Sequence, residues 1–145
     1  MRVYIASKYL AHETINHEIH TELQNAGIDS FLPKSINIDA ITDAELFQVG
    51  ERCYDEIDGC DVILVVYPRG DSVSSEVGYA ICQKRKMKIP KTIISFVDPT
   101  QYIFTKREAM ITPYYDYTVH SIQELIALLK NLNESTNLIP TVIRN

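Results

Sequence analysis

The sequence predicts an α/β domain with a flavodoxin-like, doubly wound sheet of about five parallel strands and helices on both faces. Short apolar runs alternate with segments of helical period, which is typical of repeated strand–helix units. Residues 61–67 are almost continuously apolar, as in a central parallel strand that is covered on both faces. The 145 residues, 46% of them hydrophobic, suffice for one hydrophobic core of ordinary size.

The expected strands are short segments rich in apolar and β-branched residues. They lie at 2–6, 29–33, 61–67, 91–97 and 114–119. Three other segments show no clear period. Residues 34–41 are expected to form a loop, and 99–113 a long connection of the kind that often serves as a lid or binding loop. Residues 133–145 combine a polar hinge with a short apolar end.

The first two expected helices follow the first two strands. The first covers 12–27 and closes on Gly27, which suits a C-terminal cap. Its apolar positions are Ile15, Ile19 and Leu23. The second begins at Thr42, which stands at capping-box spacing from Glu45. Its expected buried stripe is Leu46, Val49, Cys53, Ile57 and Cys60.

The third and fourth expected helices follow the third and fifth strands. The third begins with Asp71 or Ser72 as its N-cap, and its apolar positions follow the i, i+4, i+7, i+8 pattern: Val73, Val77, Ala80 and Ile81. The fourth covers 121–132, where Ser121 and Glu124 again have capping-box spacing.

A flavodoxin-like strand order places the ligand site between strands one and three, outside their carboxyl ends. Those ends are Ala6-Ser7 and Tyr67-Pro68. The polar window YPRGDSVSSEVGYA, residues 67–80, therefore lies at the expected ligand site.

Glu76 is the strongest catalytic candidate in this window. It falls at the edge of the apolar stripe of the third helix, partly desolvated, and near the positive end of the helix dipole, which favours the ionised form that a nucleophile needs. Asp71 can point into the same cleft, and two acidic groups beside a sugar permit chemistry at an anomeric carbon. Tyr4, on the neighbouring strand, could donate a hydrogen bond to Glu76 and orient it.

The serines of this region are candidates for substrate contacts. Ser7, Ser72, Ser74 and Ser75 could hold sugar hydroxyls or a phosphate through their hydroxyls and the helix amides. The structural alternative is that Asp, Ser and Glu are simply the residues preferred at a helix start. The window contains no Walker lysine and no G-x-G-x-x-G, so a conventional nucleotide loop is not expected.

The composition argues against a nucleic-acid or membrane protein. The formal net charge is -5 with both signs interspersed, whereas a binder of the nucleic-acid backbone usually has a basic face. No segment approaches the length of a membrane span, and the N-terminus lacks the pattern of a secretory signal. The three cysteines, at unremarkable spacings, suit a reducing compartment. We therefore expect a cytoplasmic protein whose partner is a small molecule.

Four further features have ordinary structural interpretations beside the functional ones. His12, His17 and His20 do not match a known metal-ligand spacing and fit a polar helix face. The cysteines fit helix packing rather than a catalytic thiol. The tyrosines of residues 113–119 could stack on a base or simply fill a strand. The basic run 83–91 complements a helix end.

Four stretches resemble the nucleoside 2-deoxyribosyltransferase superfamily, which includes related nucleoside and nucleotide N-glycoside hydrolases. They are the opening VYIAS, FLP after the first helix, the passage ERCYDEIDGCDVILVV, and SSEVGYA, which matches the family's E-x-G-x-A signature. The resemblance covers most of the chain. It implies that Glu76 captures the deoxyribosyl group as a covalent intermediate, that Asp71 contacts the substrate and assists proton transfer, and that Tyr4 positions the nucleophile.

The same resemblance implies a homo-oligomer, a dimer or larger, in which a neighbouring subunit's C-terminal region completes the site. Residues 1–133 would form the catalytic domain, and 134–145 a tail that contacts the neighbour. The implied chemistry uses no cofactor and no metal.

The sequence departs from the family pattern at two places. The family loop usually reads D-x-G-[TSV] with the aspartate six residues before the glutamate; here Gly70 stands at that offset, Asp71 follows, and Ser72 replaces the glycine. Many transferases carry an acidic residue eight positions before the aspartate that leads strand three, and this position is Cys53. We expect Gly70, Ser72 and Cys53, with Ser7, to lie beside the substrate.

Two classes of function remain open. As an enzyme, the chain would cleave or transfer the N-glycosidic bond of a nucleoside or nucleotide, and the acceptor, water or a second base, would make it a hydrolase or a transferase. As a non-catalytic sensor, it would bind a nucleotide or nucleotide sugar in the same cleft.

Overall fold

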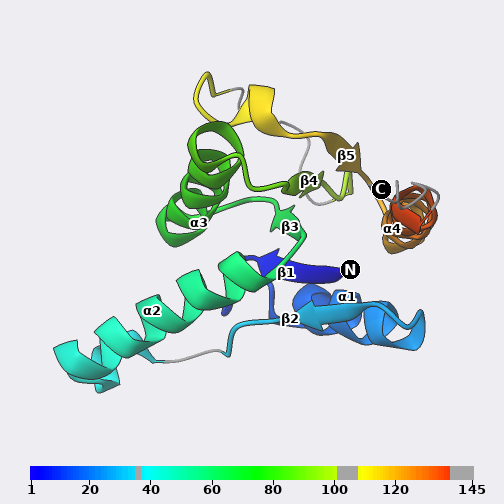
Figure 1. The fold of residues 1–145 in the computed structure, drawn as a ribbon. Coiled ribbons are helices and arrows are strands. Elements are labelled where there is room, and N and C mark those ends of the chain that lie inside the picture. The colour runs from blue at the N-terminus through cyan, green and yellow to red at the C-terminus, as the bar shows by residue number, and fades with distance from the viewer. Residues whose placement is uncertain (35–36, 101–107, 138–145) are drawn as a thin grey trace.

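The computed structural model of the chain describes residues 1–34, 37–100 and 108–137. Its strands form one parallel sheet in the order β2-β1-β3-β4-β5 (Figure 1). They are β1 (Arg2–Ala6), β2 (Asp29–Phe31), β3 (Val62–Val66), β4 (Thr92–Phe96) and β5 (Tyr117–Val119). The strand order reverses between β1 and β3, so the predicted flavodoxin-like α/β fold is confirmed.

Helices cover both faces of this sheet (Figure 1). They are α1 (Glu13–Asn25), α2 (Asp43–Gly59), α3 (Asp71–Cys82) and α4 (Ile122–Asn137), with short turns η1 (Ile38–Ala40), η2 (Gln83–Met87) and η3 (Thr112–Tyr114). None of these described helices combines the length and hydrophobicity needed to span a bilayer.

The alternation of side chains along β1 divides the core in two. Val3 and Ile5 belong to a buried cluster with residues of α1 and α4, whereas Tyr4 and Ala6 belong to a cluster with residues of α2 and α3. Successive side chains of a strand point to opposite faces, so this division follows from the strand itself. Tyr4 is therefore directed toward the helix that carries Glu76.

Two of the predicted helix ends have the expected geometry. Gly27 follows α1 with φ of 74°, a left-handed conformation that glycine adopts without steric cost. Thr42 caps α2 through a complete capping box with Glu45, in which each side chain bonds the other residue's backbone.

The predicted buried stripe of α2 is wrong at its N-terminal end. Ile57 and Cys60 are buried and Val49 and Cys53 are half-buried, but Leu46 is 40% exposed, and the adjacent Phe47, which is outside the stripe, is 62% exposed. Figure 1 shows the reason: the N-terminal half of α2 extends beyond the edge of the sheet, so its apolar side has no layer to pack against.

The C-terminal end of α2 is fixed by Lys91. Its buried ammonium donates hydrogen bonds to the carbonyls of Ile57, Asp58 and Cys60 at the end of the helix. A cation at this end also complements the negative pole of the helix dipole. This contact holds the half of α2 that carries Cys53 against the sheet.

Several element boundaries differ from the predictions. The last strand begins at Tyr117 because residues 112–114 form η3, and the loop at 34–41 contains η1. The predicted hinge is helical as far as Asn137, because α4 continues through it. Residues 101–107 of the long connection and the tail from 138 onward lie outside the described residues.

Candidate active site

Glu76 and Tyr4 meet in the α2/α3 half of the core. The hydroxyl of Tyr4, which is fully buried on β1, donates a hydrogen bond to Oε1 of Glu76 over 2.8 Å. Glu76 itself is half-buried on α3. The bond that the sequence predicted between these two residues is therefore present.

The ionisation of Glu76 differs from the sequence expectation. Burial raises its pKa from 4.5 to about 7, and the hydrogen bond from Tyr4 lowers it only in part. The physical reason is the position of the helix start. Because α3 begins at Asp71, Glu76 lies in the second turn, where the helix dipole has largely decayed. Near neutral pH the carboxyl is thus divided between its acidic and ionised forms.

Cys53 joins this pair from α2. Its thiol interacts with the Tyr4 hydroxyl, and burial raises the pKa of the thiol. Burial, and then Glu76, likewise raise the pKa of Tyr4, so the phenol remains a donor at physiological pH. The phenol of β1 therefore lies between the thiol of α2 and the carboxyl of α3. Cys53 thus places a thiol at the position where the sequence resemblance suggests an acid.

Asp71 and Ser72 lie at the start of α3 but not at its N-cap. The N-cap is Gly70, without a side-chain hydrogen bond, and Asp71 is the first helical residue. The prediction of Asp71 or Ser72 as N-cap was therefore wrong, and Asp71 belongs to the helix rather than to the preceding loop. Both side chains are exposed. Within the described residues neither side chain is hydrogen-bonded to Glu76.

Two of the four candidate serines are engaged within α3. The hydroxyls of Ser74 and Ser75 each donate to the backbone carbonyl four residues earlier. Ser72 is exposed, and the buried Ser7 hydroxyl has no partner in the described part of the chain. Ser7 and Ser72 thus have hydroxyls without a hydrogen-bond partner among the described residues, and of the two only Ser72 is exposed.

The loops after β1 and β3 are in direct contact. A side chain added at Gly70 would place its Cβ 2.8 Å from Cε of Lys8, because the Lys8 side chain crosses this position. The imidazole of His12 lies 3.2 Å from the carbonyl oxygen of Pro68 and is within hydrogen-bonding distance. Gly70 therefore allows the two loops to approach each other beside α3.

Arg69 forms a polar network that sequence patterns did not indicate. Its guanidinium pairs with Glu108, donates to the Ser74 hydroxyl over 2.6 Å and donates to the Tyr67 hydroxyl over 3.3 Å. The Tyr67 hydroxyl in turn bonds that of Tyr115. The network joins the start of α3 to the β4–β5 connection, through residues distant in sequence, so no local motif could reveal it.

The tyrosines near β5 have separate environments. Tyr115 packs edge-on against Tyr67 with ring centroids 6.0 Å apart, Tyr114 lies under the guanidinium of Arg85, and Tyr117 is exposed. Stacking on a base stays a prediction for these rings. As for metals, the described ranges contain no group of three or more His, Cys, Asp or Glu side chains that could hold an ion.

Together, the fold and this site define an α/β protein with a buried, phenol-linked carboxyl where the strand order reverses. More particularly, the fold is that of the 2-deoxyribosyltransferases. A 2-deoxyribosyltransferase from Bacillus psychrosaccharolyticus is similar with a TM-score of 0.66 and 16% identity over 87% of this chain and 90% of that one. The corresponding enzyme from Leishmania mexicana has a TM-score of 0.54 and 13% identity, over 90% and 97% of the two chains.

A conserved protein from Enterococcus faecalis V583 is also similar, with a TM-score of 0.66 and 15% identity over 91% of this chain and 98% of that one. Neither a protein-family model nor a curated protein sequence matches the chain. The structural likeness establishes the fold.

Proposed function

We propose that the chain cleaves or transfers the N-glycosidic bond of a deoxynucleoside or deoxynucleotide through a glycosyl-enzyme at Glu76. The observation that carries this proposal is the 2.8 Å bond from Tyr4 to Oε1 of a carboxyl whose pKa is about 7. The Tyr4 hydroxyl is hydrogen-bonded to one carboxylate oxygen of Glu76, Oε1. Among the described residues the other oxygen, Oε2, accepts no hydrogen bond and is not fully buried. Oε2 is therefore the atom that can reach a substrate.

The proposed reaction has two steps. Oε2 of ionised Glu76 attacks the anomeric carbon, the bond to the base breaks, and its electron pair leaves with the base, which takes up a proton from solvent or from Asp71. Water or a second base then attacks the same carbon and gives up a proton to the same group, the bond to Glu76 breaks, and the carboxylate is released. Tyr4 holds the nucleophile in position, and Asp71, with Ser7 and Ser72, would contact the substrate.

Two observations support this substrate class. The neighbour from B. psychrosaccharolyticus is described as a biocatalyst for the synthesis of antiviral and antitumoral nucleosides. The SSEVGYA segment, which carries the family resemblance, forms the part of α3 that presents Glu76 to Tyr4.

Hydrolysis is the second candidate, and Cys53 favours it. A neutral thiol stands beside Tyr4 where many transferases carry an acid, so a group suited to protonating and orienting an exchanging base is missing. A water molecule that acts as the acceptor needs no group to protonate or orient it as a base.

The test is chromatography of the purified protein after incubation with each deoxynucleoside and its monophosphate, with and without a different free base. A new nucleoside would establish transfer, and free base without exchange would establish hydrolysis. In both cases Glu76→Ala should abolish turnover and leave the circular dichroism unchanged. If no substrate reacts, the enzyme proposal fails, and a non-catalytic sensor becomes the better explanation.

The assembly is proposed from the resemblance. The exposed apolar residues of α2, Leu46 and Phe47, offer a surface that a second copy of the chain could cover. Sedimentation of the wild type should give a dimer or larger species, and Phe47→Glu should shift it toward the monomer. A wild type that sediments as a monomer at high concentration would contradict this.

A further inference from the structure

The start of α3 has no side-chain cap. Its N-cap is Gly70, which has no side chain that could accept a hydrogen bond from the first backbone amides of the helix. The same helix carries Glu76, whose hydrogen bond from Tyr4 requires α3 to keep its position beside β1. Beyond the burial of Val73, the first turn therefore depends on contacts other than a cap.

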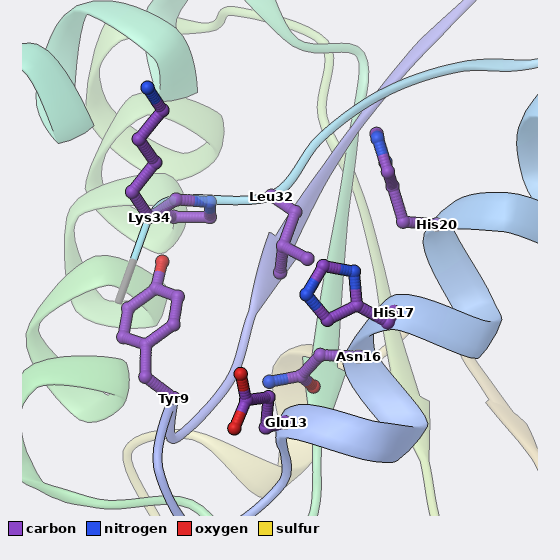
Figure 2. Close-up of a pocket in the computed structure, with 8 residues that line it drawn as sticks. Tyr9, Glu13, Asn16, His17, His20, Leu32 and Lys34 are labelled. Atoms are coloured by element: carbon purple, nitrogen blue, oxygen red, sulfur yellow. The ribbon is translucent and has the colours of Figure 1, made fainter. Parts of the chain in front are cut away.

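The loop after β1 lies beside this helix start but does not hold it by hydrogen bonds. The Lys8 side chain passes Gly70, and the His12 imidazole is within hydrogen-bonding distance of the Pro68 carbonyl, which precedes the helix. Tyr9 lines a pocket against α1 (Figure 2). Among the described residues, no side chain of this loop is hydrogen-bonded to α3, so a polar anchor has to come from elsewhere.

Arg69 supplies a polar anchor for the start of α3. Its guanidinium has a different partner at each nitrogen: Nη1 donates to the Ser74 hydroxyl over 2.6 Å, Nε donates to the Tyr67 hydroxyl over 3.3 Å, and Nη2 pairs with Glu108. The Ser74 hydroxyl in turn donates to the carbonyl of the N-cap, Gly70, over 3.1 Å. The guanidinium thus links the first turn of α3 to the end of β3 and to the β4–β5 connection.

This anchor depends on the shape of an arginine. A planar guanidinium reaches three acceptors at fixed angles, whereas a lysine has one nitrogen and cannot reproduce that fork. The Arg69 side chain is only 9% exposed, and its charge is balanced by Glu108, so it is not a free cation for a substrate. Its partner Ser74 lies two residues before Glu76. Arg69 is therefore suited to act on the site through the position of the helix.

We propose that Arg69 is a positioning residue for the reaction: by holding Ser74 it fixes the uncapped start of α3 and keeps Glu76 against Tyr4. The inference rests on the proposed function, because it gives Arg69 a part in presenting the nucleophile. Loss of the contact lets the first turn of α3 shift and weakens the bond between Tyr4 and Glu76. A displaced nucleophile lowers turnover although Arg69 itself does not touch the substrate.

The test is a pH titration of the Glu76 carboxyl by NMR, on protein with isotope-labelled glutamate carboxyls, in which Glu76→Gln identifies the signal. The wild-type midpoint should be near 7. Arg69→Lys keeps a cation beside Glu108 but loses the fork, and Ser74→Ala removes the hydroxyl on α3. Both should move the midpoint upward, toward that of Tyr4→Phe, and lower kcat/KM about 3- to 10-fold, the effect of one weakened hydrogen bond.

The midpoint reports the position of the carboxyl because the other ionisable groups near Glu76 are unchanged in these variants. Those groups are Tyr4 from β1, Cys53 from α2 and Tyr9 from the loop after β1. Arg69→Lys also preserves the charge at position 69. A shift therefore reflects movement of the carboxyl relative to Tyr4, and not the loss of a neighbouring charge.

The matched control is the next serine of α3. Ser75→Ala removes a hydroxyl that also donates to the carbonyl four residues earlier but has no arginine partner, so the midpoint should stay at the wild-type value. Ser74→Thr keeps the hydroxyl and should restore the wild-type midpoint. In the double variant of Arg69→Lys with Ser74→Ala, the shift should be no larger than the larger single shift, because both substitutions remove the same contact.

Three results would overturn the inference: an unmoved or lowered midpoint in Arg69→Lys and Ser74→Ala, an equal shift in Ser75→Ala, or additive shifts in the double variant. The titration needs no substrate, which separates this outcome from failure of the proposed function. Turnover with an unmoved midpoint removes only the role of Arg69. A midpoint that moves as expected, without turnover of any substrate, removes the proposed enzyme and leaves Arg69 as the residue that positions this carboxyl.

Discussion

The Tyr4 hydroxyl donates to Oε1 of Glu76 over 2.8 Å, linking β1 to α3 at the point where the strand order reverses. Burial raises the pKa of the Glu76 carboxyl, and this bond opposes the rise. One phenol therefore influences both where the carboxyl lies and how much of it is ionised near neutral pH.

Removing that phenol should change the rate and its pH dependence together. For the wild type we expect kcat/KM to rise with pH through a midpoint near 7, because the ionised carboxylate attacks. Tyr4→Phe should lower the maximum about 10- to 100-fold, as for a lost bond to a charged group, and move the midpoint to higher pH. Tyr79→Phe, which loses a bond to Asp58 elsewhere, should change neither. An unmoved midpoint would show that Tyr4 does not influence the ionisation.

The stability of the protein should depend on pH through Glu76. Its folded-state pKa is above its ordinary value, so the folded protein binds this proton more tightly, and the free energy of unfolding falls as pH rises from about 4.5 to about 7. The full shift corresponds to roughly 3 kcal/mol. Glu76→Gln, which has no such proton, should gain stability relative to wild type between pH 5 and pH 8 in urea unfolding.

Glu45 provides a control of opposite sign for that experiment. The capping box with Thr42 lowers the pKa of Glu45, so its contribution is present above the ordinary pKa and is lost as pH falls. Glu45→Gln should therefore differ from wild type more at pH 8 than at pH 3, and always as the less stable protein. The same pH trend in both variants would contradict the assignment to Glu76.

Introducing an acid at position 53 should favour base exchange. In Cys53→Asp the new carboxylate lies beside Tyr4 and should raise the pKa of Glu76 through repulsion, moving the midpoint of kcat/KM upward. If an acid here assists the base, the ratio of transfer to hydrolysis should also rise. Cys82→Asp, at an exposed position of α3, is the matched control. Equal ratios in both variants would remove Cys53 as the determinant of the acceptor.

The Arg69 network should contribute measurably to stability. The Arg69 side chain is only 9% exposed, and Arg69→Ala would leave Glu108 without its cation. We expect a loss of about 2 to 4 kcal/mol in urea unfolding. Lys86→Ala, at an exposed position, should cost no more than about 0.5 kcal/mol. Similar losses in the two variants would mean that the Arg69–Glu108 pair adds little to stability.

The features that the sequence predicted correctly depend on local patterns. The capping box at Thr42, the glycine after α1 and the apolar β3 strand each follow from neighbouring residues. The pairing of Tyr4 with Glu76 could be predicted from the expected strand order. In a parallel sheet of that order the ends of β1 and β3 lie side by side, and α3, which carries Glu76, follows β3.

The features that it missed depend on tertiary structure. A helical wheel identifies the apolar side of α2 but not that the helix extends past the sheet and leaves Phe47 exposed. The protonation of Glu76 depends on how deeply it is buried, and the environment of Arg69 on Glu108, which is distant in sequence.

The central claim is that Glu76 carries the sugar. The most direct measurement is the intact mass of the protein after rapid acid quench with a substrate that it turns over, followed by peptide mapping. We predict a mass increase of one glycosyl group on the peptide that contains Glu76, absent from Glu76→Gln. Product formation without any adduct, or an adduct on another residue, would contradict the account.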